Sequence, residues 1–411
     1  MMKYRGYDPD RDKKSVARIW REIGWLEKKE YEKAMDAVLK CGRTMVAEVN
    51  GEAECMVNTS PGTLRYLEED LDISLITGVA TSRVARKRGL ASTLTAKTLT
   101  QEAACGMKVA LLGIFEQGYY NQLGFGNGSY EHWCTFDPAD LNVDVRPPIP
   151  ARITTKEWKM AHRSRLARLR RHGTCSVTPP EMTQADMLWS ENGFGLGYID
   201  AASGELTHHF WCSTKAVGNG PYTIRWMSYR TKKEFLELLA LIKQLGNQVH
   251  SVKLYEPPGI QLQDLLAQPF KAREITSKSQ HENRMSASAY WQARIIDLPG
   301  CLEQTRLPGD TVRFNLILTD PVERFFDKEN RWSGAAGDYI VTLGPSSSAE
   351  PGRKKGLPIL NASINAFTRL WLGVRPATGL AWTDELSGSQ GLLARLDSVL
   401  RLPTPQTDWD F

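Results

Sequence analysis

The stretch Val79-Ala80-Thr81-Ser82-Arg83-Val84-Ala85-Arg86-Lys87-Arg88-Gly89-Leu90-Ala91 decides how the first part of the chain folds. It reads as the end of a strand (Ile73 to Thr81), a basic turn, and the start of a helix that runs to about Cys105 and stops at Gly106. Another strand is predicted at Lys108 to Phe115. Strand, turn, helix and strand in this order predict a βαβ unit with two parallel strands.

The turn has the features of an anion site. Gly89 stands at the mouth of the helix, where free backbone N–H groups and the helix dipole favour a phosphate. Four basic side chains precede it: Arg83, Arg86, Lys87 and Arg88. On chemistry alone, a solvated basic turn whose glycine allows tight packing is an equally good interpretation.

Upstream of this unit, Thr44 to Val49 and Ala53 to Val57 flank the turn Asn50-Gly51, which predicts a β-hairpin. A helix is expected before the hairpin, with Ser15 as its N-cap. Its apolar residues share one face: Val16, Ile19, Trp20 and Ile23.

A second block repeats the order more faintly. Leu196 to Asp200 and Leu206 to Cys212 predict a hairpin, Thr223 to Tyr229 a strand, and Phe235 to Leu245 a helix, before a strand at Val249 to Leu254. The turn Tyr229-Arg230-Thr231-Lys232-Lys233 has no glycine, so we expect a duplicated fold without the ligand turn.

The third block alternates at Val312, Phe314, Leu316 and Leu318 as a half-buried strand does, and helices are expected near 364–372 and 392–400. The segment 346–355 is polar and punctuated by glycine and proline, which predicts a mobile loop. The proline-rich segment 146–150 sets a first boundary, so the predicted domains are 1–145, 146–288 and 289–411, and the fold class is α+β.

Composition limits the function. A chain of 411 residues with 41% hydrophobic and 24% charged residues is soluble and globular, with room for two to four domains. A net charge of +5 suits an anionic ligand but is too diffuse for nucleic acid. Seven scattered cysteines and seven histidines without ligand spacing give no disulfide framework and no metal site. Without an apolar segment of membrane length or a signal peptide, we expect a cytoplasmic protein with no membrane partner.

Two motifs carry a family resemblance. Arg86-x-x-Gly89-x-Ala91 after a Val-Ala-Thr strand resembles the coenzyme A turn, R/Q-x-x-G-x-G/A, of the GNAT N-acetyltransferases. Arg83 and Ala85 depart from the proline and the aromatic residue of many members. The resemblance implies acetyl-CoA as co-substrate, with its pantetheine arm along one group of residues and its pyrophosphate on backbone N–H groups of another. These groups are Val79, Ala80 and Thr81, and Arg86, Lys87, Arg88, Gly89, Leu90 and Ala91.

The segment Tyr120-Asn121-Gln122-Leu123-Gly124-Phe125 resembles the GNAT pattern Y-x-x-x-G-[YF], whose tyrosine is the general acid that meets the departing thiolate. Tyr120 fits by spacing, and Tyr119 is the alternative. A tyrosine that merely packs under a loop is the purely structural interpretation.

The tail Gln406-Thr407-Asp408-Trp409-Asp410-Phe411, with Trp291 to Asp297 and the helix near 364–372, resembles the Eis (enhanced intracellular survival) acetyltransferases. This implies two GNAT-type domains, the second degenerate, and a sterol-carrier-protein-like third domain. It also implies the terminal carboxylate of Phe411 as the base, or as the anchor of a water that does that work. The substrate-binding residues implied are Trp25, Gly78 and Asp410. The acidic stretch Glu68 to Asp72 is the alternative source of the base.

The expected activity is acetyl transfer to a primary amine by direct attack on the thioester. The expected acceptor is an aminoglycoside, a polyamine or a lysine-type amine, and the sequence does not choose among these three. A homo-oligomer is expected, since the resemblance implies a hexamer. The alternative function is a lipid or hydrophobe carrier with a vestigial acetyltransferase domain. The intact turn at Arg86 to Ala91 argues against this alternative.

Overall fold

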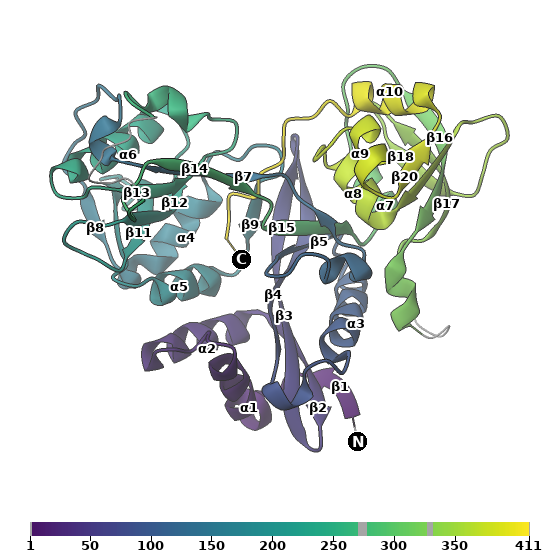
Figure 1. Ribbon diagram of the computed structural model, residues 1–411, viewed down its shortest axis with the longest axis horizontal. Coiled ribbons are helices and arrows are strands. Elements are labelled where there is room, and N and C mark those ends of the chain that lie inside the picture. The colour runs from purple at the N-terminus through teal and green to yellow at the C-terminus, as the bar shows by residue number, and fades with distance from the viewer. Residues whose placement is uncertain (1, 270–277, 327–331, 411) are drawn as a thin grey trace.

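The computed structural model describes residues 2–269, 278–326 and 332–410. Over these residues the chain is a mixed α and β protein whose strands form three sheets, each accompanied by helices (Figure 1). None of the helices in the described ranges has the length and hydropathy to span a bilayer.

The first sheet has eight strands. Its edge-to-edge order is β1 (Met2–Gly6), β2 (Arg43–Val49), β3 (Glu52–Tyr66), β4 (Glu69–Thr81), β5 (Val109–Gly113), β15 (Trp291–Ile295) and β6 (Gly126–Asn127), with β9 (Cys175–Val177) paired to β3. The predicted hairpin is confirmed: β2 and β3 turn at Asn50 and Gly51, which both have positive φ. The predicted parallel pair is β4 and β5.

Helices cover both faces of this sheet. Figure 1 places α1 (Pro9–Glu22) and α2 (Glu32–Cys41) on one side of β3 and β4, and α3 (Leu90–Ala104) on the other. Helix α1 begins earlier than expected, because Asp8 and not Ser15 caps it: the Asp8 carboxylate accepts from the Asp10 N–H at 3.0 Å. Ser15 lies inside the helix.

The second sheet repeats the arrangement. Its order is β14 (Arg284–Ser288), β7 (Glu131–Phe136), β13 (Val252–Tyr255), β12 (Tyr222–Ser228), β11 (Leu206–Thr214), β10 (Phe194–Ile199) and β8 (Ala151–Ile153). The predicted hairpin is β10 and β11, and β12 and β13 are parallel. Its helices are α4 (Trp158–Leu166), α5 (Pro180–Trp189) and α6 (Lys232–Gln244).

The third sheet is smaller. Its order is β18 (Ser348–Pro351), β17 (Gly337–Leu343), β16 (Val312–Thr319), β19 (Ile359–Ser363) and β20 (Leu386–Gly388). The alternating run Val312 to Leu318 is β16, and its four apolar side chains are buried as predicted. The predicted loop 346–355 contains β18 instead. The helices are α7 (Leu298–Glu303), α8 (Ile364–Trp371), α9 (Ala377–Thr383) and α10 (Gln390–Val399).

Two strands cross between the predicted domains. Strand β7 precedes residue 145 but pairs with β13 in the second sheet, and β15 follows residue 288 but pairs with β5 in the first. The boundaries at 145 and 288 remain predictions about the chain, and the sheets do not follow them strictly.

One apolar core joins the first and third sheets. Tyr66 of β3 stacks on Trp371 of α8 with ring centres 4.7 Å apart, and its hydroxyl donates to the Trp371 carbonyl at 2.9 Å. Nearby, Arg294 of β15 and Asp320 form an ion pair whose side chains are both fully buried, at 2.6 Å. These contacts fix the third sheet against the first.

Candidate active site

The two parallel strands of the first sheet separate at one end. Strands β4 and β5 pair from Ile73 opposite Val109 to Ile76 opposite Leu112. Beyond this point Gly113 of β5 pairs with Trp291 of β15, whereas β4 continues to Thr81 paired with β3. The separation leaves the β5 side of residues 77–81 without a strand partner among the described residues. An extended ligand can add to such an edge by backbone hydrogen bonds.

Gly78 lies in the separated part of β4, where the β3–β4 register shifts. Its φ of +58° is one that a side chain would strain, and a Cβ there would lie 3.6 Å from the Trp20 ring. Trp20 is buried and contacts Trp25 edge to face, with ring centres 5.3 Å apart. The structure therefore brings two of the predicted substrate-binding residues, Gly78 and Trp25, to one region, with Trp20 between them.

The basic turn lies directly after this edge. Lys87 and Gly89 have positive φ, and Gly89 starts α3 without any side-chain cap, so the first N–H groups of the helix have no side-chain partner in the part of the chain that the structure describes. A Cβ at Gly89 would meet no atom within 4 Å, so the space in front of the helix is open. Arg83, Arg86, Lys87 and Arg88 are exposed around it. An open helix N-terminus among cations favours phosphate.

Tyr120 follows β5, at the start of a short 3-10 helix (Tyr120–Leu123), and shares an apolar cluster with Ala85 and Leu90 of the basic turn and α3. Its ring is buried edge to face against Tyr119, with centres 4.9 Å apart, and against Phe115 and Phe125. Among the described residues its hydroxyl forms no hydrogen bond. Burial raises the pKa of Tyr120 above its ordinary value, so the phenol is protonated at neutral pH.

Tyr119 is half-buried, and burial raises its pKa to about 12. The Cys55 thiol is close enough to raise the pKa of both tyrosines. Cys55 pairs with Thr81 at the end of β4, and the Thr81 hydroxyl donates to its sulfur at 3.2 Å. The structure thus gathers both tyrosines near the end of the free edge. Four of the predicted site residues share one apolar cluster: Val79, Leu90, Ala91 and Tyr120.

The acidic stretch Glu68 to Asp72 lies elsewhere. It forms the far end of the β3–β4 hairpin, where Asp70 pairs with Arg170 at 2.6 Å. Asp70 precedes Gly78 by eight positions of an extended strand, about 26 Å at 3.3 Å per residue. This stretch is therefore not brought to the opening, and the alternative base is not supported.

The chain's tail runs between the first and second sheets (Figure 1). The Cys175 N–H donates to the Thr407 carbonyl at 2.9 Å, and Asp408 pairs with the buried Arg168 at 2.6 Å. Trp409 is buried with the Arg165 guanidinium 3.5 Å from its ring centre. Asp410 follows, whereas Phe411, the predicted base, lies outside the described residues.

The arginines of the basic stretch 163–171 differ in exposure. Arg165 and Arg168 are buried beneath the tail, and Arg165 lies between the rings of Trp409 and Trp226, 4.2 Å from the centre of the latter. Arg163, which pairs with Glu205 at 2.9 Å, and Arg171 are exposed.

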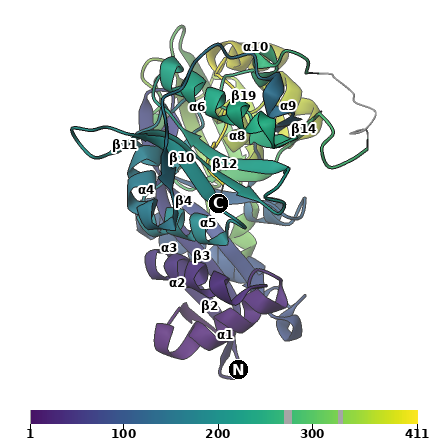
Figure 2. The same ribbon diagram turned by 90° about the vertical axis from the view of Figure 1, so that its left-hand side faces the viewer.

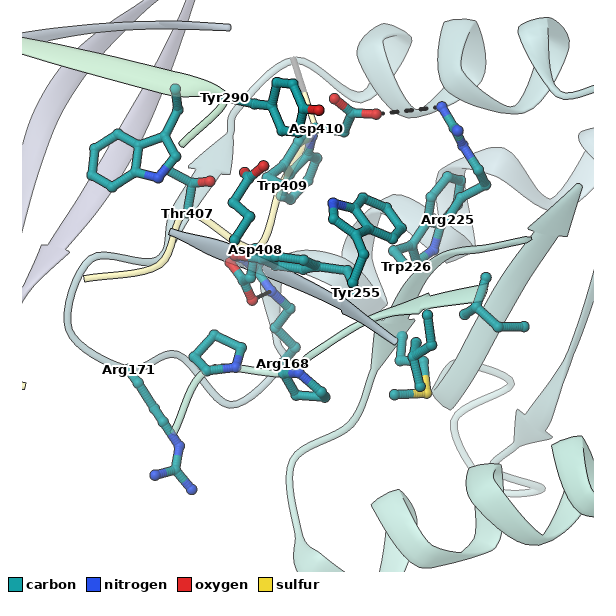
Figure 3. A pocket seen from close by; sticks show the side chains of 18 of the residues that line it. Arg168, Arg171, Arg225, Trp226, Tyr255, Tyr290, Thr407, Asp408, Trp409 and Asp410 are labelled. Carbon is teal, nitrogen blue, oxygen red and sulfur yellow. Dashed lines mark hydrogen bonds and ion pairs between the residues drawn. The ribbon is translucent and has the colours of Figure 1, made fainter. Parts of the chain in front are cut away.

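A cavity of about 110 Å³ lies beside the tail (Figure 3). In the second sheet the parallel strands β12 and β13 pair only as far as Ile224 opposite Leu254. The cavity lies where these two strands separate beyond that pair. Its wall also contains Gly113, the first residue of β5 beyond the parallel pairing, and Asp410 of the tail. The cavity therefore extends from the tail to the end of β5 in the first sheet.

Sequence reasoning missed most of this cavity, including Glu131, Trp226 and Tyr255. Burial and the nearby Asp410 carboxylate raise the pKa of Glu131 to about 7. These residues come from three strands of the second sheet, so no spacing along the chain relates them to the turn at Gly89. Only the pairing of β7 with β13 places Glu131 there.

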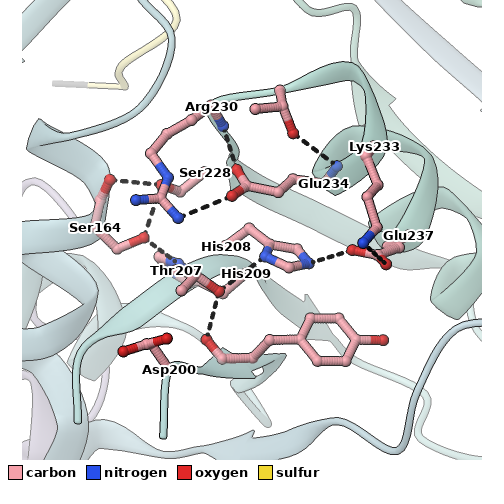
Figure 4. Close-up of polar contacts among 12 residues, drawn as sticks. Ser164, Asp200, Thr207, His208, His209, Ser228, Arg230, Lys233, Glu234 and Glu237 are labelled. Carbon is pink, nitrogen blue, oxygen red and sulfur yellow. Dashed lines mark hydrogen bonds and ion pairs between the residues drawn. The ribbon is translucent and has the colours of Figure 1, made fainter. Parts of the chain in front are cut away.

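The second sheet's turn is closed, as the missing glycine suggests (Figure 4). The Thr231 hydroxyl caps α6 by accepting from the Glu234 N–H at 3.2 Å. The Glu234 carboxylate accepts from the Arg230 N–H at 2.6 Å and from its guanidinium at 2.8 Å. Nearby, His208 lies 3.1 Å from Glu237. An internal carboxylate thus takes the place where the first turn is open to an external anion.

Comparison with known proteins agrees with this geometry. Residues 9–128 match the model of an acetyltransferase (GNAT) domain. No curated protein sequence matches the chain. Among the described residues, no group of three or more histidine, cysteine, aspartate or glutamate side chains could hold a metal ion.

Solved structures share the fold over the whole chain. A protein of unknown function from Enterococcus faecalis, described as a probable N-acyltransferase, has a TM-score of 0.79 at 18% identity, over 100% of both chains. A GCN5-related N-acetyltransferase from Anabaena variabilis has a TM-score of 0.78 at 14% identity, again over 100% of both. Eis1 from Mycobacterium abscessus has a TM-score of 0.75 at 15% identity, also over 100% of both. Residues 9–128 therefore form an acetyltransferase domain of the GNAT family, in a chain that shares its fold with these three structures over its whole length.

Proposed function

We propose that this enzyme transfers an acetyl group from acetyl-CoA to a primary amine. The observation that carries the proposal is the separation of β4 from β5 immediately before the uncapped N-terminus of α3. The separated edge of β4 offers backbone hydrogen bonds to an extended ligand. The N-terminus of α3 offers free N–H groups to the phosphates of that ligand. A pantetheine arm that ends in a pyrophosphate needs both, in this order.

In the proposed complex the pyrophosphate lies on the backbone of Arg86 to Ala91, and the pantetheine arm lies along Val79 to Thr81. The exposed cations of the turn add attraction for the phosphates. Acetyl-CoA is thus a co-substrate whose thioester ends near the point where β4 and β5 part.

The proposed reaction is direct attack. The amine nitrogen forms a bond to the thioester carbonyl, an N–H near Val79 stabilises the oxyanion, and the C–S bond then breaks. Tyr120 donates its phenolic proton to the departing sulfur, which its protonated state at neutral pH supports. The terminal carboxylate of Phe411, or a water that it holds, receives one proton of the ammonium group before the attack. The second proton, which the nitrogen loses as the amide forms, returns to Tyr120 and restores its phenol.

The position of the tail supports a role for it in the site. The tail is buried between two sheets as far as Trp409, and Asp410 lines the cavity that also contains Gly113. We propose Asp410, Trp25 and Gly78 as acceptor-binding residues. The third sheet with its helices is proposed as a sterol-carrier-protein-like domain, and the assembly as a homo-oligomer. An aminoglycoside, a polyamine or a lysine side chain fits the proposal as acceptor.

The proposal is tested by acetyl-CoA binding to Gly89→Asp. A carboxylate at the uncapped helix N-terminus would occupy the place of the pyrophosphate and repel it, so calorimetry should show no binding. Gly106→Asp is a matched control, because Gly106 has φ +80° and open space like Gly89 but lies just beyond the C-terminal end of α3. It should bind acetyl-CoA like the unmodified protein.

Unchanged affinity in Gly89→Asp would overturn the assignment of the turn. Release of CoA in the presence of a panel of primary amines then tests transfer itself. A melting temperature raised by palmitate but not by acetyl-CoA would favour the alternative, a lipid carrier with a vestigial acetyltransferase domain.

A further inference from the structure

The cavity beside the tail contains one carboxylate without a partner. Its charged side chains are Glu131, Asp408, Asp410, Arg168, Arg171 and Arg225. Asp408 pairs with Arg168 at 2.6 Å, and Asp410 pairs with Arg225 at 3.3 Å, as Figure 3 shows. The Arg171 side chain points away from the other labelled residues in that figure. Among the described residues Glu131 forms neither an ion pair nor a side-chain hydrogen bond, so it is the one carboxylate of the cavity without a partner.

Two further polar groups in the cavity lack partners. The Tyr255 hydroxyl and the Trp291 indole N–H are both buried and have no hydrogen-bond partner among the described residues. Buried polar groups are normally paired, and an orphan in a native structure indicates a missing ligand, water or ion. Burial raises the pKa of Tyr255 well above its ordinary value, and the nearby Glu131 carboxylate adds to the rise. The orphan hydroxyl and the unpaired carboxylate are therefore neighbours.

The remaining wall is aromatic. Trp133 lies two residues from Glu131 on the same face of β7, and the Trp133 ring lies 5.5 Å from that of Tyr255 on the paired strand β13. This face already holds one cation, because the Lys253 ammonium lies 4.4 Å from the centre of the Trp133 ring. A carboxylate among aromatic faces is the chemistry that recognises an ammonium group.

We propose that Glu131 is a specificity-determining residue that receives the ammonium group of the acceptor in this cavity, next to Gly113 at the opening of the first sheet. The inference rests on the proposed function and deepens it, since it names the residue that selects a cationic acceptor. Glu131 positions the amine, and the proton is taken up elsewhere, by the tail.

The charge state of Glu131 sets when this selection works. Besides Asp410, the titratable groups of the cavity are Asp408, held in its ion pair, and Tyr229, Tyr255 and Tyr290. Burial raises the pKa of Tyr229 and Tyr255, so these two stay neutral in the neutral range. Because the pKa of Glu131 is about 7, the carboxylate is charged above neutrality and becomes protonated below it. Ammonium binding should therefore weaken as the pH falls through 7.

The test is binding of n-butylamine, with n-butanol as the neutral probe of the same length. Tryptophan fluorescence reports on the cavity because Trp133, Trp226, Trp291 and Trp409 line it. Glu131→Gln should weaken n-butylamine binding roughly 10- to 100-fold, the usual effect of losing a hydrogen bond to a charged group, and leave n-butanol unchanged. Glu350→Gln, an exposed position on β18, is the matched control and should bind both probes normally.

The pH dependence gives a second readout. From about pH 8.5 to about pH 5.5, n-butylamine stays an ammonium ion while Glu131 becomes protonated, so binding should weaken in the unmodified protein but not in Glu131→Gln. The Glu131→Gln protein should fold normally. The pKa of Glu131 is raised in the folded state, so its stabilising effect is lost as the pH rises through 7, and Glu131→Gln should melt no lower than the unmodified protein above that pH.

In transfer assays with n-butylamine and acetyl-CoA, Glu131→Gln should raise KM and change kcat little. Equal n-butylamine affinity in both proteins, or no binding to either, would overturn the role of Glu131. If n-butylamine binds as expected but acetyl-CoA does not, the proposed function fails while the ammonium site stands. The two failures are therefore distinguishable.

Discussion

The chemistry assigned to Tyr120 follows from its surroundings. Its ring is held by three aromatic neighbours, so the hydroxyl has a fixed direction, and burial keeps it protonated. Tyr119 has a similar pKa direction but is less buried. Sequence spacing to Gly124 favours Tyr120, and the structure keeps both rings near the end of β4, so only a measurement separates them.

We predict that Tyr120→Phe keeps acetyl-CoA affinity but loses roughly 10²- to 10⁴-fold in turnover, the usual effect of a missing general acid. The aromatic packing is retained in phenylalanine, so the melting temperature should not fall. Tyr119→Phe is the matched control and should turn over near normally. If the loss appears in Tyr119→Phe instead, the acid is Tyr119.

At the scale of elements, the tail is held by the arginines of α4 and the loop after it. Arg168 and Asp408 form an ion pair with side chains 4% and 13% exposed, and Arg168 also donates to the carbonyls of Arg165 and Cys175. Arg163, one turn earlier, pairs with Glu205 at 53% and 49% exposure. Burial should therefore make the two pairs very different in energy.

We predict that Arg168→Met lowers the free energy of unfolding by about 3 kcal/mol or more, because it leaves the Asp408 carboxylate buried without its partner. Arg163→Met should change it by about 1 kcal/mol or less, as for exposed ion pairs. Urea unfolding measures both. Equal effects of the two substitutions would mean that the tail is not anchored through Arg168.

The whole molecule places its two ends very differently. The N-terminal strand β1 lies at the outer edge of the first sheet, whereas the C-terminal tail lies between two sheets, as Figures 1 and 2 show. Any group added after Phe411 also turns its terminal carboxylate into a neutral amide. The two termini should therefore tolerate additions unequally.

We predict that a C-terminal affinity tag cripples turnover and that the same tag at Met1 does not. Deleting Phe411 moves the terminal carboxylate back by one residue, about 3.3 to 3.6 Å along an extended chain, and should also impair turnover without unfolding the protein. Activity and melting temperature of the three proteins are compared side by side. Full activity of the C-terminally tagged chain would refute the role of the terminal carboxylate.

Local patterns in the sequence determined much of the architecture. The turn at Asn50-Gly51, the strand, turn and helix around Gly89, and the alternation along β16 each depend on neighbours within a few residues, so side-chain periodicity reports them directly. The start of α1 was misplaced because Asp8 and Ser15 are both competent caps, and local sequence does not rank them. Strand β18 was missed because its polar residues carry no apolar alternation.

Only the tertiary structure decided how distant strands meet. The crossing of β7 and β15 between sheets depends on backbone hydrogen bonds, which leave no mark on residue type. For the same reason the sequence determined the open turn before α3 but not the cavity, whose Glu131, Tyr255 and Trp291 come from three separate strands. The fate of Arg165 and Arg168 was also undecided, because a run of arginines is exposed unless an aromatic ring and a carboxylate from elsewhere in the chain cover it, as Trp409 and Asp408 do.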